Sequence, residues 1–205
     1  MKIIMMVNSD FVDYYDKFID NFRDGIVYNR YISKSMARGK ALCYLNNMGI
    51  KTIELKQVVE FSTLDGNIVV YNDIYAHNGK GKAIMSVNEA LKYHSNCLAS
   101  KFYITDGTTV KFLQVGQRRF YVTYKKNNVN SLEIGNIVNV QELPSAYNDY
   151  IRLPIFSIDY IPVNGIMAAT DFNECQNMQL IELDSIMTGR NAVYEIKNAI
   201  KHYNI

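Results

Sequence analysis

The sequence predicts an α+β fold, because segments with the patterns of β-hairpins and of helices alternate along the chain. The two clearest hairpins occupy residues 108–124, which turn near Gly116, and residues 155–172, which turn at Asn164-Gly165. Asn-Gly is a dipeptide typical of the tight turns that join antiparallel strands. This mixed order argues against a purely parallel, doubly wound sheet.

Helices are predicted where apolar residues recur at helical spacing and where capping residues flank them. The helix expected over residues 35–48 has Ser35 as its N-cap and Gly49 after its last turn. Ser86 with Glu89 forms a capping box for a later helix. The other predicted elements are helices over residues 13–22, 87–93 and 191–203, and strands over residues 2–7, 52–61, 68–71, 83–85, 108–115, 119–124, 155–161 and 166–172.

Length and composition are those of an ordinary globular protein. The chain has 205 residues, of which 48% are hydrophobic and 20% charged, and its formal net charge is +2. This composition excludes wholesale disorder, and the small net charge gives no global attraction to nucleic acid or to anionic lipid. The first apolar run, residues 3–7, is too short for a signal peptide or a membrane span. We therefore expect a cytoplasmic protein with no membrane partner.

The three cysteines and the three histidines are dispersed along the sequence. None of them stands at the spacing of a zinc site, and an odd number of isolated cysteines does not indicate a disulfide framework. Any metal that this chain binds is therefore expected to be held by carboxylate and amide oxygens.

Asp159, Asp171 and Asn173 form the strongest cluster of candidate functional residues. Asp171 and Asn173 are two residues apart, so in a strand both side chains point to the same face. The turn in this hairpin folds their strand back beside the strand that holds Asp159. Two carboxylates and an amide oxygen are ligands that suit Mg²⁺. The alternative is a pair of solvated acids that flank a turn.

The second cluster is a loop rich in glycine and lysine, residues 77–82, between two predicted strands. Gly79 and Gly81 would let backbone N–H groups approach a phosphate. Lys80 and Lys82 would place ammonium groups beside it. The loop lacks the pattern of a Walker motif, and a basic hairpin turn is the alternative interpretation.

These two clusters belong to a series of segments that resembles the ATP-grasp family of ATP-dependent carboxylate–amine ligases. The chain is most similar to the branch that adds amino acids to the ends of peptides or proteins. The matching segments are residues 40–50, 68–85, 111–126 and 156–174, within a resemblance that covers residues 35–205. The metal hairpin is the most specific part, since the family has an acid, a second acid twelve residues later and an Asn fourteen residues later. Asp159, Asp171 and Asn173 occupy these three places.

The resemblance implies a two-lobed ATP-grasp fold that holds the nucleotide between two mixed or antiparallel sheets. It divides the chain into a shortened N-terminal segment, residues 1–34, and an ATP-grasp-like domain, residues 35–205, with lobes over residues 35–105 and 106–205. The implied reaction is ATP- and Mg²⁺-dependent formation of an amide or peptide bond through an acyl phosphate. The implied partners are ATP, an unidentified carboxylate and an unidentified amine. A peptide or protein acceptor, or a homo-oligomer that completes the site, would fit the short N-terminal segment.

The resemblance also implies a role for each candidate residue. It places two catalytic basic residues at Lys111 and Lys125, and the metal ligands at Asp159, Asp171 and Asn173. The residues that would bind ATP are Arg38, Gly79, Lys80, Gly81, Lys82, Phe102 and Tyr103.

Several places depart from the family pattern. Tyr71 stands where the family has a lysine, Lys101 where it has the acid of the adenine-binding strand, and Asp171 where it usually has Glu. We expect Lys80 or Lys82 to replace the missing lysine. These departures leave a catalytically inactive, ATP-grasp-like binding module as the alternative to a ligase.

A small nucleic-acid-binding protein is the other alternative. The basic pairs at residues 118–119 and 125–126 lie among aromatic residues, a mixture that can stack bases. Alternating inner and outer faces of one hairpin explain the same pattern, and we prefer that interpretation.

Overall fold

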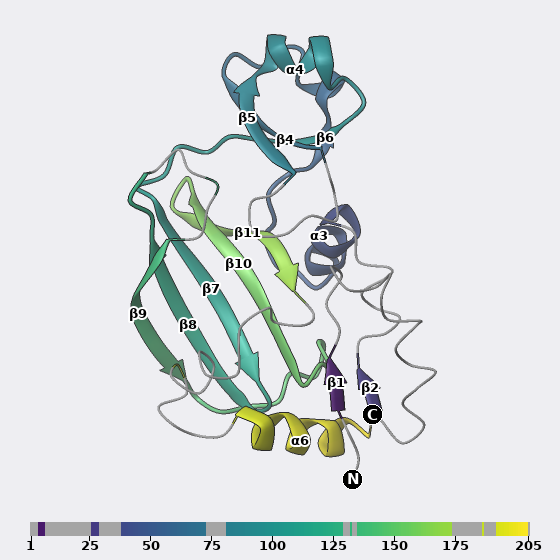
Figure 1. Ribbon diagram of the computed structural model, residues 1–205, viewed down its shortest axis with the longest axis vertical. Coiled ribbons are helices and arrows are strands. Elements are labelled where there is room, and N and C mark those ends of the chain that lie inside the picture. The colour runs from purple at the N-terminus through teal and green to yellow at the C-terminus, as the bar shows by residue number, and fades with distance from the viewer. Residues whose placement is uncertain are drawn as a thin grey trace.

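The computed structural model describes residues 4–6, 26–28, 38–72, 81–128, 132, 135–173, 186 and 192–204. Within these residues the strands form one sheet of five strands, one of four and one of two. Every pairing in the two larger sheets is antiparallel, and helices pack against both sheets, so the predicted α+β class is confirmed. Figure 1 shows the four-stranded sheet above the five-stranded one.

The five-stranded sheet, here called the large sheet, contains both predicted hairpins. Its strands lie in the order β11 (Ile166–Asn173), β10 (Ile155–Val163), β7 (Thr108–Val115), β8 (Arg118–Lys125) and β9 (Asn136–Leu143). The turn between β10 and β11 has φ angles of +51° at Asn164 and +80° at Gly165, the left-handed conformation that a two-residue Asn-Gly turn requires. The sequence analysis does not predict β9, whose residues are almost all exposed.

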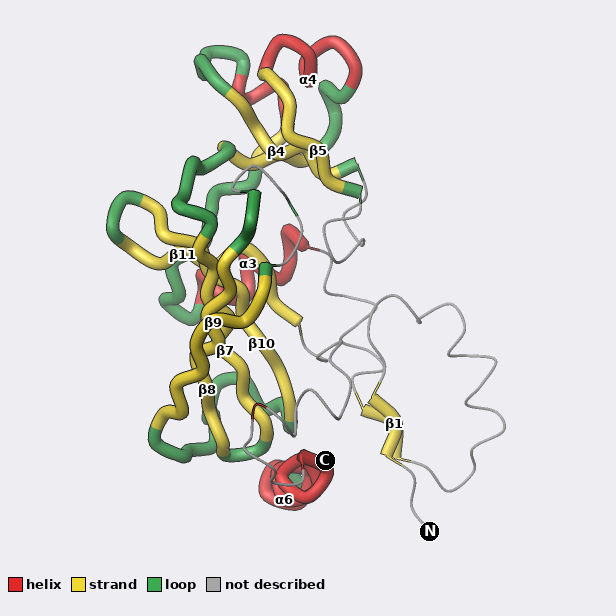
Figure 2. The backbone as a smooth tube through the Cα atoms, turned by 60° about the vertical axis from the view of Figure 1, so that its left-hand side comes forward, coloured by secondary structure: helices red, strands yellow, loops and turns green. Residues whose placement is uncertain are grey.

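The four-stranded sheet, here called the small sheet, has the order β3 (Lys56–Gln57), β6 (Leu98–Lys101), β4 (Asn67–Tyr71) and β5 (Lys82–Ser86). β4 and β5 match the strands predicted over residues 68–71 and 83–85. Helix α4 (Val87–Tyr93) follows β5, and the Ser86 hydroxyl accepts a hydrogen bond from the Glu89 N–H at 3.3 Å, which confirms Ser86 as the N-cap of the predicted capping box. Figure 2 shows α4 on the side of the small sheet that faces away from the large sheet.

The strand predicted over residues 52–61 is wrong as a single element. Thr52 makes an isolated parallel bridge to Ala169, two residues pair as β3, and a 3₁₀ turn, η2 (Val58–Phe61), follows. Val58 and Phe61 are both buried. Residues three apart point to the same side in a 3₁₀ turn but to opposite faces in a strand, which is why burial favours the turn here.

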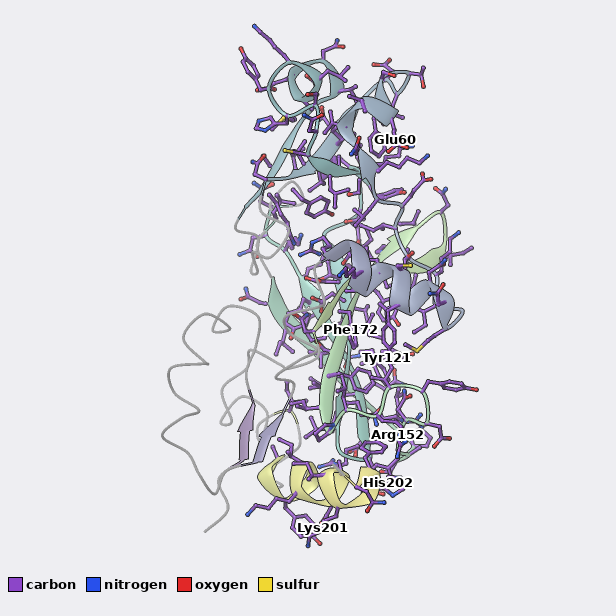
Figure 3. The ribbon with its side chains drawn as sticks, turned by 90° about the vertical axis from the view of Figure 1, so that its right-hand side faces the viewer. Glu60, Tyr121, Arg152, Phe172, Lys201 and His202 are labelled. Atoms are coloured by element: carbon purple, nitrogen blue, oxygen red, sulfur yellow. The ribbon has the colours of Figure 1, made fainter. Side chains whose placement is uncertain are left out.

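Two helices cover opposite faces of the large sheet. The residues of α3 (Arg38–Asn47) that pack on one face are Ala41, Leu42 and Leu45, against Phe156, Ile158 and Phe172, the last of which is labelled in Figure 3. The residues of α6 (Ala192–Tyr203) that pack on the other are Ile196 and Ile200, against Leu113, Val115, Phe120 and Val122. We call these sides the α3 face and the α6 face. Because successive strand residues alternate between faces, every second residue of β7 and of β8 belongs to the α6 face.

The end of α3 follows the prediction. Gly49 has a φ of +79°, and its N–H donates to the Asn46 carbonyl at 2.9 Å. The Ile50 N–H donates to the Leu45 carbonyl at 3.1 Å. These two bonds and the left-handed glycine form the helix-ending motif that a C′ glycine predicts.

Two further predicted elements, near the two ends of the chain, have counterparts in the structure. α6 agrees with the helix predicted over residues 191–203, and β1 (Ile4–Met6) lies within the strand predicted over residues 2–7 and pairs in parallel with β2 (Ile26–Tyr28). Ser35 and the helix predicted over residues 13–22 lie outside the described residues. In the described part of the chain, no helix has both the length and the apolar character needed to cross a membrane.

Candidate functional site

The centre of the site is a row of three charged residues across the large sheet. Asp159 of β10 is the direct partner of Asp171 on β11 and of Lys111 on β7. Directly opposite residues on neighbouring strands share a face. For this row it is the α6 face, which also carries Leu113 two residues further along β7. The structure therefore brings together the two carboxylates that the sequence predicts to converge.

Each carboxylate is paired with a buried cation. Lys111 Nζ lies 2.6 Å from Asp159 Oδ1. Arg38, the first residue of α3, donates from Nη2 to Asp171 Oδ2 at 3.1 Å and from Nη1 to the Thr170 carbonyl at 2.8 Å. Lys111 is only 7% exposed and Arg38 only 5%, so both cations are held in a largely dehydrated place that is unfavourable unless charge partners are present.

Arg38 retains an unused hydrogen-bond donor. Its Nε–H group is buried and has no partner among the described residues. A buried N–H that is left unpaired costs about 1–3 kcal/mol. An acceptor such as a phosphate or carboxylate oxygen would therefore be stabilised beside it.

The small sheet contributes Tyr71 and Lys82, which are direct partners on β4 and β5. The guanidinium carbon of Arg38 lies 5.0 Å from the centroid of the Tyr71 ring, and Lys82 Nζ lies 5.9 Å from the same centroid. The Tyr71 hydroxyl is hydrogen-bonded to the Ser100 hydroxyl on β6 at 3.1 Å. Since Arg38 also contacts Asp171, this arginine connects the small sheet with the acidic hairpin of the large sheet.

Electrostatic interactions join Lys82 to the same group of charges. Burial lowers the pKa of Lys82 to about 8, with the Arg38 guanidinium acting in the same direction and Asp171 and Asp159 opposing it. The Lys126 ammonium also lowers the pKa of Lys82, and burial lowers the pKa of Lys126.

Among the described residues, the site has more positive than negative charge. Lys111 and Arg38 are paired with the two carboxylates, Lys82 interacts with both of them, and Lys126 acts on Lys82. An excess of dehydrated cations attracts a polyanion, and the triphosphate of a nucleotide is a ligand of that kind.

Asn173 extends the row of oxygen ligands. It lies two residues beyond Asp171 on β11, opposite Ser157, and therefore on the same face. Among the described residues no three His, Cys, Asp or Glu side chains form a metal-binding group. A cation at this hairpin would have two carboxylates and the Asn173 amide as its protein ligands, which is the donor set that the sequence predicts.

Lys125 lies apart from this group. In the β7–β8 pairing Lys111 is opposite Val122, so Lys125, three residues further along β8, points to the opposite face. Its ammonium is exposed and pairs with Asp106 at 2.8 Å. Lys126, which the sequence analysis does not select, acts instead on Lys82. Counting the alternation along β8 from the position opposite Lys111 would have pointed to it.

Of the other residues expected to bind ATP, only some lie next to this site. Gly81 has a φ of +64° and accepts the Asn72 N–H at 2.8 Å, next to Lys82 at the start of β5. Phe102 and Tyr103 follow β6, and Tyr103 packs against the apolar cluster of the α3 face. Gly79 and Lys80 lie outside the described residues.

The arginines considered for nucleic-acid binding make contacts within the large sheet. Arg118 binds the Glu142 carboxylate through Nε at 2.8 Å and Nη2 at 2.7 Å. Arg119 donates from Nε to the Pro144 carbonyl at 2.9 Å. Along β8, buried residues alternate with more exposed ones. These contacts favour the interpretation of this segment as two faces of one hairpin.

No family model matches the sequence, and no curated protein matches it by sequence. Comparison of structures is more informative. The chain is similar to the ATP-grasp ligase PsnB in complex with a minimal precursor, with a TM-score of 0.57 and 9% identity over 98% of this chain and 79% of that one. It is similar to D-alanine–D-alanine ligase from Bacillus anthracis, with a TM-score of 0.56 and 10% identity over 99% of this chain and 98% of that one.

A third similar structure is a biotin carboxylase from Campylobacter jejuni, with a TM-score of 0.60 and 11% identity over 97% of this chain and 54% of that one. Identities this low establish the fold alone. The chain has the ATP-grasp fold, as the resemblance in the sequence implies.

Proposed function

We propose that this chain is an ATP- and Mg²⁺-dependent ligase that joins a carboxylate to an amine through an acyl phosphate. The observation that carries the proposal is the row of Lys111, Asp159 and Asp171, with Arg38 and Lys82 beside it. The ATP-grasp fold supports the same function, since the similar structures include PsnB in complex with its minimal precursor, Mg and ADP.

The residues of the acidic hairpin fit Mg²⁺. Asp159 and Asp171 are directly opposite each other, and Asn173 shares their face. The two carboxylate side chains are 32% and 16% exposed, so a hydrated cation can reach them. Mg²⁺ prefers oxygen ligands of this kind and keeps several waters or phosphate oxygens. Bound there, it would neutralise charge on the phosphates of ATP.

The proposed reaction has two steps. First, a carboxylate oxygen of the substrate attacks the γ-phosphorus of ATP, the bond from that phosphorus to the β,γ-bridging oxygen breaks, and ADP leaves. Then the amine nitrogen attacks the acyl carbon, the bond from that carbon to the phosphate oxygen breaks, and the nitrogen loses a proton. The products are an amide and inorganic phosphate.

The cations of the site suit the first step. Negative charge is spread over the oxygens of the transferring phosphoryl group, and preorganised cations lower the barrier by offsetting it. We assign this role to Lys111, Arg38 and Lys82. ATP would lie between the small sheet and the large sheet, in keeping with lobes over residues 35–105 and 106–205. The carboxylate and the amine are unidentified, and a peptide or protein acceptor fits the proposal.

Two measurements test the proposal. A titration with ATP in the presence and absence of Mg²⁺, followed by thermal shift, should show stabilisation that depends on the metal. ADP release should then rise when pooled amino acids and small peptides, or a cell extract, are added, with a product mass that corresponds to loss of water from the joined substrates. Metal-dependent ATP binding without ADP release or a new product would instead indicate an inactive binding module.

A further inference from the structure

Tyr71 has an unusual place in the candidate site. It is an aromatic residue, 5% exposed, that lies near two cations: the Arg38 guanidinium at 5.0 Å and the Lys82 ammonium at 5.9 Å from its ring centroid. The hydroxyl at the far end of the ring is satisfied by Ser100, itself 2% exposed. The ring is therefore fixed by the small sheet, and the two cations contact it.

The two cations are unfavourable next to each other unless a neighbouring group attracts both of them. Arg38 is buried and Lys82 is partly buried, and the Arg38 guanidinium adds to the effect of burial in lowering the pKa of Lys82, so the two cations repel each other. The electron-rich face of an aromatic ring attracts cations within about 6 Å, and most strongly when they are dehydrated. A ring in contact with both cations can hold them close together when no phosphate is bound.

Arg38 is also held at a defined angle. Two of its donors are fixed on the large sheet by Thr170 and Asp171, while its third contact is the Tyr71 ring on the small sheet. A further donor of the same guanidinium, Nε–H, is buried and unpaired among the described residues. The orientation of the guanidinium plane, which the ring helps to set, decides where this free N–H points.

We infer that Tyr71 is a positioning residue of the ATP site: its ring orients Arg38 and Lys82 so that both cations, including the free Nε–H of Arg38, face the phosphates. This inference rests on the proposed function. In this view Tyr71 is a platform for two cations and does not merely mark the absence of a lysine. A lysine at position 71 would add a third cation beside Arg38 and Lys82 and would weaken the site.

The test distinguishes the effect of the ring's electron density from the effect of its size. Tyr71→Phe keeps the ring and loses only the hydroxyl, so affinity for Mg·ATP should stay within twofold of wild type. Incorporation of mono-, di- and trifluorinated phenylalanine at position 71 then withdraws electrons from the ring stepwise with little change in size. Affinity for Mg·ATP should fall stepwise, to about a tenth with the trifluorinated ring, while the thermal midpoint without nucleotide stays nearly constant.

Three further variants complete the test. Tyr71→Leu should lose at least tenfold in affinity, Tyr71→Lys should bind no better than Tyr71→Leu, and Ser100→Ala, which removes the hydroxyl partner but leaves the ring, should remain within twofold. An unchanged affinity across the fluorinated series overturns the inference, as does a Tyr71→Lys variant that binds Mg·ATP more tightly than wild type. If the wild type itself does not bind Mg·ATP, the proposed function fails and the inference fails with it, so the two failures are distinguishable.

Discussion

The α6 face of the large sheet differs sharply between its two ends, although the same strands form both. At the end covered by α6, Leu113 and Ile155 are buried among apolar neighbours. Two residues from Leu113 along β7, on the same face, Lys111 is buried to nearly the same extent but is paired with Asp159. On this face of β7, a distance of two residues separates the apolar core from the charged site.

The difference shows which end is built for stability and which for a ligand. Apolar side chains at the α6 end contribute to folding through burial. Ion pairs in buried positions contribute little net stability compared with apolar residues of similar size, because both charges lose their hydration. The charged end is therefore poorly explained by folding alone.

The largest effect is expected at the charged end. Asp171→Asn removes one negative metal ligand but keeps an oxygen that can accept from Arg38, so the fold should persist. We expect loss of at least a hundredfold in Mg²⁺-dependent ATP turnover, measured as ADP release, and a clear loss of Mg·ATP affinity in a binding titration. Asp106→Asn is the matched control, since Asp106 also pairs with a lysine but lies outside the row. Equal losses in both variants would contradict the assignment of Asp171.

The apolar end should respond in the opposite way. Leu113→Ala removes a side chain that is fully buried, two residues from Lys111 on the same face. Large-to-small substitutions of this kind cost about 2–5 kcal/mol of unfolding free energy. Chemical denaturation should show this loss, while the affinity of the folded variant for Mg·ATP stays within about twofold of wild type. A much larger loss of affinity would mean that the two ends are not separable.

A third prediction concerns the pH dependence of the charged end. The pKa of Lys82 is lowered to about 8, mainly by burial, so its ammonium is lost as the pH rises through that value. A hydrogen bond from a charged donor contributes about 1.5–3 kcal/mol. Affinity for Mg·ATP should therefore fall roughly tenfold between about pH 7 and pH 9.5. Lys82→Arg, which stays charged throughout, should remove most of this dependence, and an unchanged profile in that variant would refute the role of Lys82.

The free protein should show the opposite trend. Lys82 has a lower pKa when folded than the 10.5 of an ordinary lysine, so above pH 8 the unfolded chain holds more protons than the folded one. The contribution of Lys82 to unfolding free energy therefore becomes more favourable as the pH rises from 8 toward 10.5. Comparing wild type with Lys82→Met by denaturation across this range isolates that contribution.

The sequence predicted what local patterns determine. The Asn164-Gly165 turn fixes the hairpin, and the spacing within that hairpin was enough to place Asp159 beside Asp171. β9 was not predicted, and since its residues are almost all exposed it has no buried face of its own.

Local sequence patterns could not predict the contacts of Arg38. Its bond to Asp171 joins residues 133 positions apart, and its contact with Tyr71 depends on how the small sheet meets the large one. The sequence analysis treats Tyr71 only as a missing lysine. The pairing of β4 with β5 places Lys82 beside its ring, and the position of α3 adds Arg38.

The smallest expected effect distinguishes Lys125 from its neighbour Lys126. The sequence resemblance selects Lys125, but in the structure this residue is exposed on the face opposite Lys111 and pairs with Asp106. Interactions between exposed charges are weak, since water and salt screen them. Lys125→Ala should therefore change Mg·ATP affinity by less than twofold.

Lys126→Ala should weaken the same affinity several-fold, because the Lys126 ammonium acts on Lys82 and is itself partly dehydrated. The two variants differ by one position and remove the same charge, so each is the control for the other. Titrations at low and at moderate salt should show a smaller salt dependence for Lys126→Ala than for Lys125→Ala, since a cation that faces the phosphates releases counterions when they bind. The reverse order would place the nucleotide on the other face of β8 and would return the catalytic role to Lys125.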